Sequence, residues 1–295
     1  MSKSKADQNG VSKREVAEDS VQKVKGSPAR TDSQAKPRDK AIDEEVYYEF
    51  GGPLGAFGLI VFSHFIMIYL WASLEFFDGD VFYPKSLGDI GPWISRLFTL
   101  WWNHALPTWE SIKIYGSFML IELIIAMVVP GFRVKGLPVP SLGYKQLEYN
   151  CNAIQSWYIM MALAAILQYT GVWSMGSVID NIGPITTTAM IAGDLLSIIL
   201  YVNAFIFKTT HRMSGNHLYD FFMGASLNPR FLNVDLKLWA EVRVSWALLF
   251  FLTLSAAVKQ YEQIGYVSVE MCVMLLAHWL YSNACHKGEE CIPSS

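Results

Sequence analysis

Long apolar runs separated by short polar segments dominate the sequence from residue 47 onward. Six of these runs approach the roughly 20 residues that a helix needs to cross a bilayer. We predict membrane spans at 54–74, 112–129, 153–169, 184–207, 242–258 and 264–281. The segment 92–109 is shorter and interrupted, and its four Trp residues are typical of a helix in the membrane interface. The pattern therefore predicts an all-α fold, a multi-pass membrane helix bundle with about six transmembrane spans.

The first 46 residues differ in composition from the rest of the chain. They contain no aromatic residue and no apolar run, and they are rich in Ser, Lys, Asp and Gln. Such a segment buries too little apolar surface to offset the conformational entropy of the chain. We predict a disordered cytosolic tail at 1–46. Because this tail lacks the apolar region of a secretory signal peptide, the first span is expected to direct the chain to the membrane.

The overall composition supports a membrane protein. Charged residues make up only 17% of the chain, and the mean hydropathy is +0.26, whereas soluble domains contain about 25% charged residues. The net charge of −3 gives no indication of a nucleic-acid partner. The four Cys residues form no CxxC pair, and His278 and His286 do not complete a zinc-type spacing with Cys285 and Cys291. We therefore predict neither a disulfide framework nor a metal site.

Basic residues set the expected orientation. If the N-terminus is cytosolic, 19 of the 23 Lys and Arg residues fall on the cytosolic side and 4 on the other side. Cytosolic loops of membrane proteins carry an excess of Lys and Arg. We therefore expect a cytosolic N-terminus, with the loop 208–243 on the same side of the membrane.

The segment 211–239, which follows the fourth predicted span, has an unusual composition for a cytosolic linker. It combines several aromatic residues with polar residues and glycines. Arg230 and Asn216 are suited to bind phosphate or ribose, Asp220 supplies a carboxylate and Tyr219 a phenol. This mixture is consistent with a lid over a site at the cytosolic mouth. An amphipathic interfacial helix with ordinary turn residues explains the same composition, and both interpretations stay open.

Three ionisable residues fall inside predicted spans: His64, Glu122 and Asp194. A charge at the bilayer centre costs about 2.5–3.5 kcal/mol on insertion scales, so such residues are candidates for function. For each of them, a satisfied hydrogen bond between helices is the alternative. Common soluble-enzyme motifs are absent, namely GxGxxG after a strand, GxxxxGK[ST], GxSxG and HExxH. We therefore do not expect a soluble-type dinucleotide fold, a P-loop, a nucleophile elbow or a zinc protease site.

The segment 215–230, GNHLYDFFMGASLNPR, resembles the signature of the sterol reductase family. The signature positions that this chain matches are Gly215, Leu218, Tyr219, Asp220, Phe222, Gly224, Leu227, Asn228, Pro229 and Arg230. Two further segments, YEFGGPLGAFG at 48–58 and KGEECIP at 287–293, are similar to the delta-24(28) branch of this family in fungal ergosterol synthesis. The resemblance begins at about residue 47 and continues to the last residues.

The resemblance implies a multi-pass enzyme of the endoplasmic reticulum that reduces a double bond of the sterol side chain with NADPH. It implies a sterol substrate, contact with membrane lipid, and other enzymes of ergosterol synthesis as partners. The candidate proton donors are, in order, Tyr219, Asp220 and Glu122. The signature residues expected near the cofactor or the substrate are Gly215, Asn216, Gly224, Asn228, Pro229 and Arg230.

In the family that the sequence resembles, the segment matching KGEECIP is followed by further spans that hold most of the NADPH site. We therefore expect 47–295 to be the N-terminal portion of a sterol reductase transmembrane domain. We also expect this chain, as a truncated member, not to reduce sterols alone. The alternative function is a non-catalytic sterol-binding or scaffold membrane protein. A transporter is disfavoured because no inverted repeat is evident.

Overall fold

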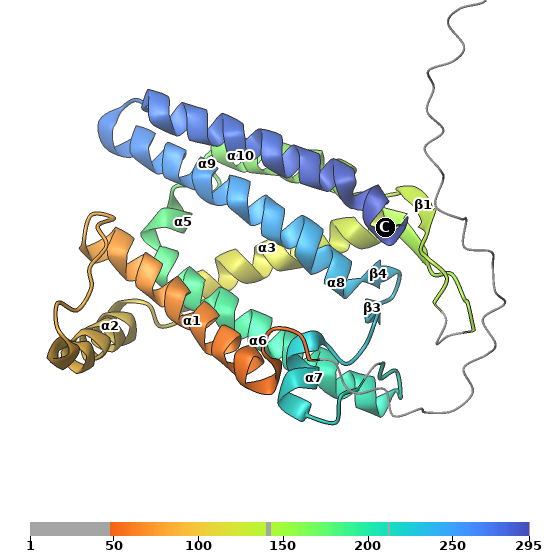
Figure 1. Cartoon of the computed structure of the whole chain (residues 1–295). Helices are drawn as coiled ribbons and strands as arrows, with labels where there is room; N and C mark the ends of the chain where they lie inside the picture. The colour runs from red at the N-terminus through yellow and green to blue at the C-terminus, as the bar shows by residue number, and fades with distance from the viewer. Residues whose placement is uncertain (1–47, 140–142, 212, 295) are drawn as a thin grey trace, which may run out of the picture. The chain divides into compact units, whose positions relative to one another are not determined.

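The computed structural model describes residues 48–139, 143–211 and 213–294 (Figure 1). The predicted disordered tail at 1–46 lies outside the described residues and stays a prediction. The described part of the chain is mostly helical. Its longer helices are α1 (Gly52–Phe76), α2 (Ile90–His104), α3 (Trp109–Val128), α4 (Ala153–Thr170), α6 (Ile182–Ile206), α9 (Ser245–Ile264) and α10 (Val269–Lys287). The shorter ones are α5 (Ser177–Asp180), α7 (His217–Met223) and α8 (Leu236–Leu238).

Four helices in the described part of the chain are long and apolar enough to cross a membrane. They are α1, α3, α6 and the continuous helix Leu236–Ile264, in which a π-helical segment, Trp239–Val244, joins α8 to α9. These four coincide with four of the six predicted spans. The other two predicted spans are also helices, α4 and α10, but they contain more polar residues and are not among these four. The structure therefore contains four candidate membrane spans among the described residues, and the prediction of six spans stays a proposal.

Two small antiparallel sheets interrupt the helical architecture, which the all-α prediction did not include. β1 (Phe132–Lys135) pairs with β2 (Glu148–Cys151), and β3 (Arg230–Phe231) pairs with β4 (Val234–Asp235). Strands of two to four residues are too short to show a period of two along the sequence. Both sheets lie in connections between helices, so they fix loops without changing the predominantly helical class of the fold.

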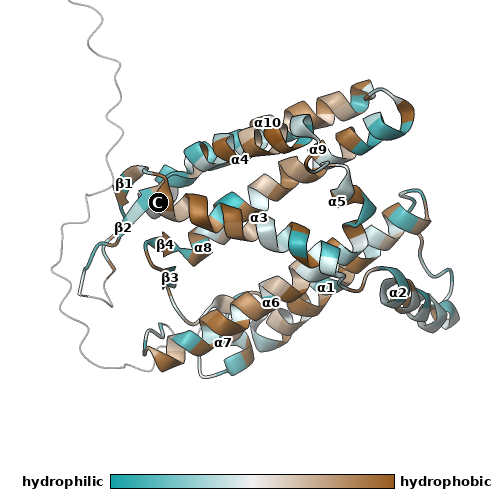
Figure 2. Ribbon diagram, turned by 180° about the vertical axis from the view of Figure 1, so that it is seen from behind, coloured by the Kyte–Doolittle hydropathy of each residue, from teal (hydrophilic) through white to brown (hydrophobic). Residues whose placement is uncertain are grey.

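The helices pack in two groups that α3 connects. α9 pairs with α10, α10 packs on α4, and their shared core contains Trp157, Met160, Phe250 and Phe251. α1 packs against α2, α6 and α7, while α3 contacts both α4 and α6. Figure 2 shows apolar residues along α3 and α6. Most side chains of α1 and α6 are only partly buried, as expected for helices whose apolar surface faces lipid.

Candidate functional site

The signature segment folds as a capped helical turn followed by a tight loop. The Asn216 side-chain oxygen accepts hydrogen bonds from the backbone N–H groups of Leu218 and Tyr219, both at 3.1 Å, and so caps α7. Gly215 and Gly224 flank this helix with φ of 85° and 83°, a region that glycine adopts without strain. Gly215 and Asn216 therefore have a clear role in local folding.

Tyr219 and Asp220 are both buried and both serve as hydrogen-bond acceptors. The Tyr219 hydroxyl accepts a hydrogen bond of 2.9 Å from the backbone N–H of Glu49, just before α1. Oδ1 of Asp220 accepts one of 2.8 Å from the backbone N–H of Ser214. Oδ2 of Asp220 is buried and has no hydrogen-bond partner among the described residues. Asp220 thus keeps one oxygen that is not used to hold the loop.

The last part of the signature is held against β2. The Asn228 side-chain amide donates to the Tyr149 hydroxyl at 2.7 Å and to Oδ2 of Asp235 at 2.9 Å. Nη2 of Arg230 donates to the backbone carbonyl of Glu148 at 2.8 Å, and its guanidinium lies 4.9 Å from the centre of the Tyr149 ring. The one arginine of the signature is therefore already engaged by protein groups.

Burial and the nearby Asp235 carboxylate raise the pKa of the Tyr149 phenol, and the Arg230 guanidinium partly offsets this effect. The phenol is therefore protonated at neutral pH and is free to donate while it accepts from Asn228. Sequence reasoning missed Tyr149 because no motif marks the short strand in which it lies.

Two cavities of about 280 and 550 Å³ lie beside the signature loop, and Lys237 and Glu241 line both of them. A Cβ added at Gly224 would lie 2.8 Å from the Lys237 Nζ, so this glycine gives the lysine room. The carbonyl of Pro229 accepts a hydrogen bond from the Leu236 backbone N–H. These contacts attach the signature loop to the first turn of the helix Leu236–Ile264.

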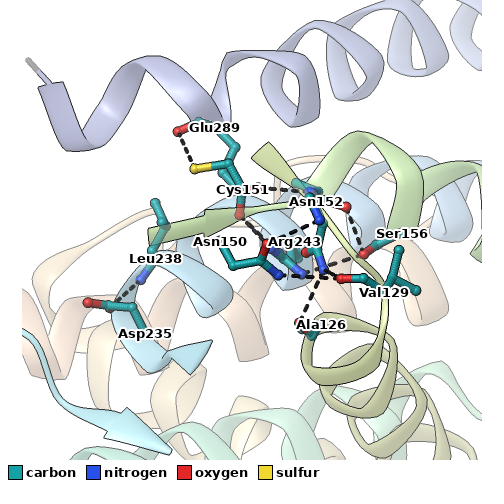
Figure 3. A network of polar contacts seen from close by, with 12 residues as sticks. Ala126, Val129, Asn150, Cys151, Asn152, Ser156, Asp235, Leu238, Arg243 and Glu289 are labelled. Carbon is teal, nitrogen blue, oxygen red and sulfur yellow. Dashed lines mark hydrogen bonds and ion pairs between the residues drawn. The ribbon is translucent and has the colours of Figure 1, made fainter. Parts of the chain in front are cut away.

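A buried ion pair joins the π-helical segment to the residues after α10 (Figure 3). Nη2 and Nε of Arg243 donate to Oε1 of Glu289 at 2.7 and 3.0 Å. Oε2 of Glu289 accepts from the Ala153 backbone N–H at 2.7 Å, and Nη1 of Arg243 reaches Oγ of Ser156 at 3.5 Å. Sequence reasoning counted Arg243 only as a loop cation. The KGEECIP segment was the one signal that pointed toward Glu289.

Glu122 lies on α3 near this ion pair and is 1% exposed. Both of its carboxyl oxygens lack a hydrogen-bond partner among the described residues, and Arg243 interacts with it electrostatically. Further buried polar atoms without such a partner are Oδ1 of Asn152, Nε1 of Trp157 and Nε2 of His286. Unsatisfied buried groups are uncommon in folded proteins, so each is a candidate contact for water or ligand.

Cys151 closes the network on the side of β2. Burial raises the pKa of its thiol to about 12, with the Glu289 carboxylate adding to the shift. The thiol therefore stays protonated at neutral pH, and its Sγ–H points to the Glu289 carbonyl at 4.0 Å. Cys151 is therefore an unreactive, structural cysteine.

An apolar cavity of about 330 Å³ lies among α3, α4, α5, α6 and α9. Its apolar lining includes Phe118, Ile121, Met160, Phe251 and Leu252. Cavities of this size and character are typical of small-molecule sites in proteins. Sequence reasoning did not predict this cavity.

The candidate residues from the sequence thus lie in separate places. Tyr219 contacts the segment before α1, and Asp220 holds the backbone of Ser214. Arg230, in β3, contacts β2, and Glu122 lies in α3. Of the other intramembrane candidates, Asp194 accepts a hydrogen bond of 3.0 Å from Nε2 of His64. This pair fits the alternative of a hydrogen bond between helices.

Comparison with known proteins assigns the chain to a family. A family model described as the ergosterol biosynthesis ERG4/ERG24 family matches residues 44–294. The chain belongs to this family. The resemblance drawn from the signature segment is thereby confirmed. The signature loop, the 48–58 segment and KGEECIP of this ERG4/ERG24 member all lie within the matched range.

The relatives of this ERG4/ERG24 member include two fungal proteins. Delta(24(24(1)))-sterol reductase erg4A of Aspergillus fumigatus is 39% identical, over 92% of this chain and 58% of its own length. Delta(24(24(1)))-sterol reductase of Gibberella zeae is 37% identical, over 92% of this chain and 46% of its own length. The Delta(14)-sterol reductase of Dictyostelium discoideum is 33% identical, over 83% of this chain and 53% of its own length. The chain spans about half the length of these curated relatives.

Proposed function

We propose that this chain binds a sterol and takes part in the NADPH-dependent reduction of the 24(28) double bond of the sterol side chain. This reaction is the last step of ergosterol biosynthesis, and we place it in the endoplasmic reticulum membrane with the N-terminus in the cytosol. The apolar cavity of about 330 Å³ between candidate membrane helices is the observation that carries the proposal. A sterol is a rigid apolar molecule with one hydroxyl, and such ligands suit cavities with few polar groups.

The described residues do not form a convincing site for NADPH. Lys237 is the one Lys or Arg that lines the two cavities beside the signature loop, and the Glu241 carboxylate lines both as well. Arg230 is engaged by Glu148 and Tyr149. A dinucleotide with several phosphate charges needs more cationic donors than this. NADPH is therefore proposed from the family relationship alone.

Reduction of an isolated double bond requires a proton on one carbon and a hydride on the other. Glu122 is the proton donor that we favour, ahead of Asp220 and Tyr219. It lies one heptad after the cavity residue Tyr115 and four residues after Phe118, so all three share one face of α3. Both of its oxygens lack a hydrogen-bond partner among the described residues, whereas one oxygen of Asp220 already accepts from Ser214. A carboxyl group so placed is suited to general acid catalysis.

A chimera tests this function: residues 44–294 of this chain replace the matching part of the longer Aspergillus fumigatus relative, and the chimera is expressed in a fungal strain that lacks its own delta-24(28) reductase. We expect sterols with a reduced side chain to accumulate with the chimera and not with the 295-residue chain alone. Glu122→Gln in the chimera should lower their amount by about a hundredfold or more, because the amide cannot donate a carboxyl proton. Glu270→Gln is the matched control, since Glu270 is exposed and lines none of the cavities described above. The measurement is the sterol profile at equal protein levels.

Wild-type sterol profiles from the Glu122→Gln variant would remove Glu122 from the chemistry. Sterol binding by the chimera without any reduction would favour the alternative function of a non-catalytic sterol-binding protein.

A further inference from the structure

The charged residues of the apolar cavity lie at one end, and the other polar residues in its lining are Tyr115, Ser117 and Ser255. Glu110, Lys113 and Tyr115, from the first two turns of α3, line it there. Lys113 and Glu110 form an ion pair of 2.5 Å. The Tyr115 side chain is 8% exposed, and no hydrogen bond from its hydroxyl to another described residue is found. This end therefore offers an aromatic hydroxyl that is free to bind a ligand, next to a charged pair.

The opposite end of the cavity is apolar. Ile121, Met160 and Phe251 line it, and Ile121 lies eight residues after Lys113. At a rise of about 1.5 Å per residue, these two positions on α3 are about 12 Å apart along the helix axis. The two ends of the cavity are thus separated along α3 and differ in polarity, so a long ligand with one polar end binds in a preferred orientation.

We propose that Tyr115 binds the ring hydroxyl of the sterol and that the sterol side chain points along α3 toward Ile121. This inference rests on the proposed function, because it assumes a sterol in the cavity. The orientation follows from the free energy that is lost when a hydroxyl is buried without a hydrogen-bond partner. In the reverse orientation, the hydroxyl lies among Ile121, Met160 and Phe251, which offer no side-chain partner.

This orientation also has a chemical consequence. The double bond to be reduced lies in the sterol side chain, which ends beside Ile121. Glu122 is the next residue of α3; it does not itself line the cavity, and both of its carboxyl oxygens are buried without a hydrogen-bond partner among the described residues. The hydroxyl anchor at Tyr115 therefore places the reacting end of the sterol beside the turn of α3 that carries the favoured proton donor.

Photoactivatable sterols test the orientation. The purified chain in lipid nanodiscs is labelled with a sterol that carries a diazirine in its side chain, and the modified residues are located by mass spectrometry. We expect saturable labelling around Ile121, Met160 and Phe251, competed by unlabelled sterol. Labelling around Ile114 and Trp173, at the polar end, would overturn the orientation while leaving sterol binding in place. No saturable labelling by any sterol probe would instead contradict the proposed function.

Substitution of Tyr115 provides a second readout. Tyr115→Phe is expected to weaken binding of a hydroxysterol by about five- to tenfold, the effect of one lost hydrogen bond. Binding of the matching 3-deoxy sterol should not change, because that ligand has no hydroxyl to lose. Tyr169→Phe is the matched control, since Tyr169 is 93% exposed and does not line the cavity. An equal loss of affinity for both sterols would overturn the assignment of Tyr115 to the hydroxyl.

Discussion

Arg243→Met is expected to destabilise the folded protein severely. The Glu289 carboxylate is 3% exposed as a side chain, and the substitution leaves it buried without its cation. Breaking a buried ion pair by removing one partner costs about 3–5 kcal/mol of the free energy of unfolding. Because this is a large share of the stability of a typical domain, most of the protein should be lost as aggregate on extraction. Fluorescence-detected size exclusion and thermal unfolding in detergent measure both effects.

The double variant Arg243→Met with Glu289→Met is the informative comparison. It removes both charges, so it should recover much of the lost stability, although the Ala153 backbone N–H then loses its acceptor. Arg243→Lys keeps a charge but not the two hydrogen bonds to Oε1, and should lie between the wild type and Arg243→Met. Equal losses for the single and double variants would show that the unpaired charge is not the cause.

Gly55→Ala is expected to disrupt the docking of the chain before α1 onto the signature helix α7. An added Cβ at this position would lie 1.8 Å from the carbonyl oxygen of Phe50, which no side-chain movement can relieve. The backbone at Phe50 must then shift, and with it the edge-on contact between the Phe50 and Phe222 rings. We expect a lower unfolding temperature and faster proteolysis within α7 in limited digestion.

Gly58→Ala is the matched control for Gly55→Ala. Gly58 lies in the same helix, one turn further, and nothing lies within 4 Å of its added Cβ. Alanine is favoured over glycine in a helix by about 1 kcal/mol, so this variant should be unchanged or slightly more stable. Similar destabilisation of both variants would mean that helix α1, and not the contact with Phe50, is sensitive to the change.

The sequence predicts the helices well because span length is a local property. A run of about 20 apolar residues identifies a span without knowledge of its neighbours, and four predicted spans coincide with the four candidate membrane helices. The two sheets were missed because pairing of strands such as β1 and β2 depends on contacts between segments, not on composition.

The candidate site was less predictable for the same reason. Arg243 and Glu289 are 46 residues apart, and no periodic pattern links them. The signature segment identified the family, yet its residues Asn216 and Asn228 are engaged in holding the loop. A sequence signature can therefore mark a fold-determining loop as readily as a binding loop.

The apolar cavity illustrates what a single sequence does not contain. Its lining comes from five helices and the loop before α5, so Tyr115, Trp173 and Phe251 meet only when these elements pack. Each of these residues alone is an ordinary apolar or aromatic position of a membrane helix or loop. That they line one cavity is visible only in three dimensions.

Saturable binding of a radiolabelled sterol to the purified chain in nanodiscs tests the central claim most directly. Ala164 is buried and lines the cavity, whereas the next residue, Ala165, is exposed and does not. Ala164→Phe fills the cavity, so we predict the loss of most saturable binding, while Ala165→Phe binds like the wild type. Wild-type binding by a folded Ala164→Phe variant would contradict the claim that this cavity is the sterol site.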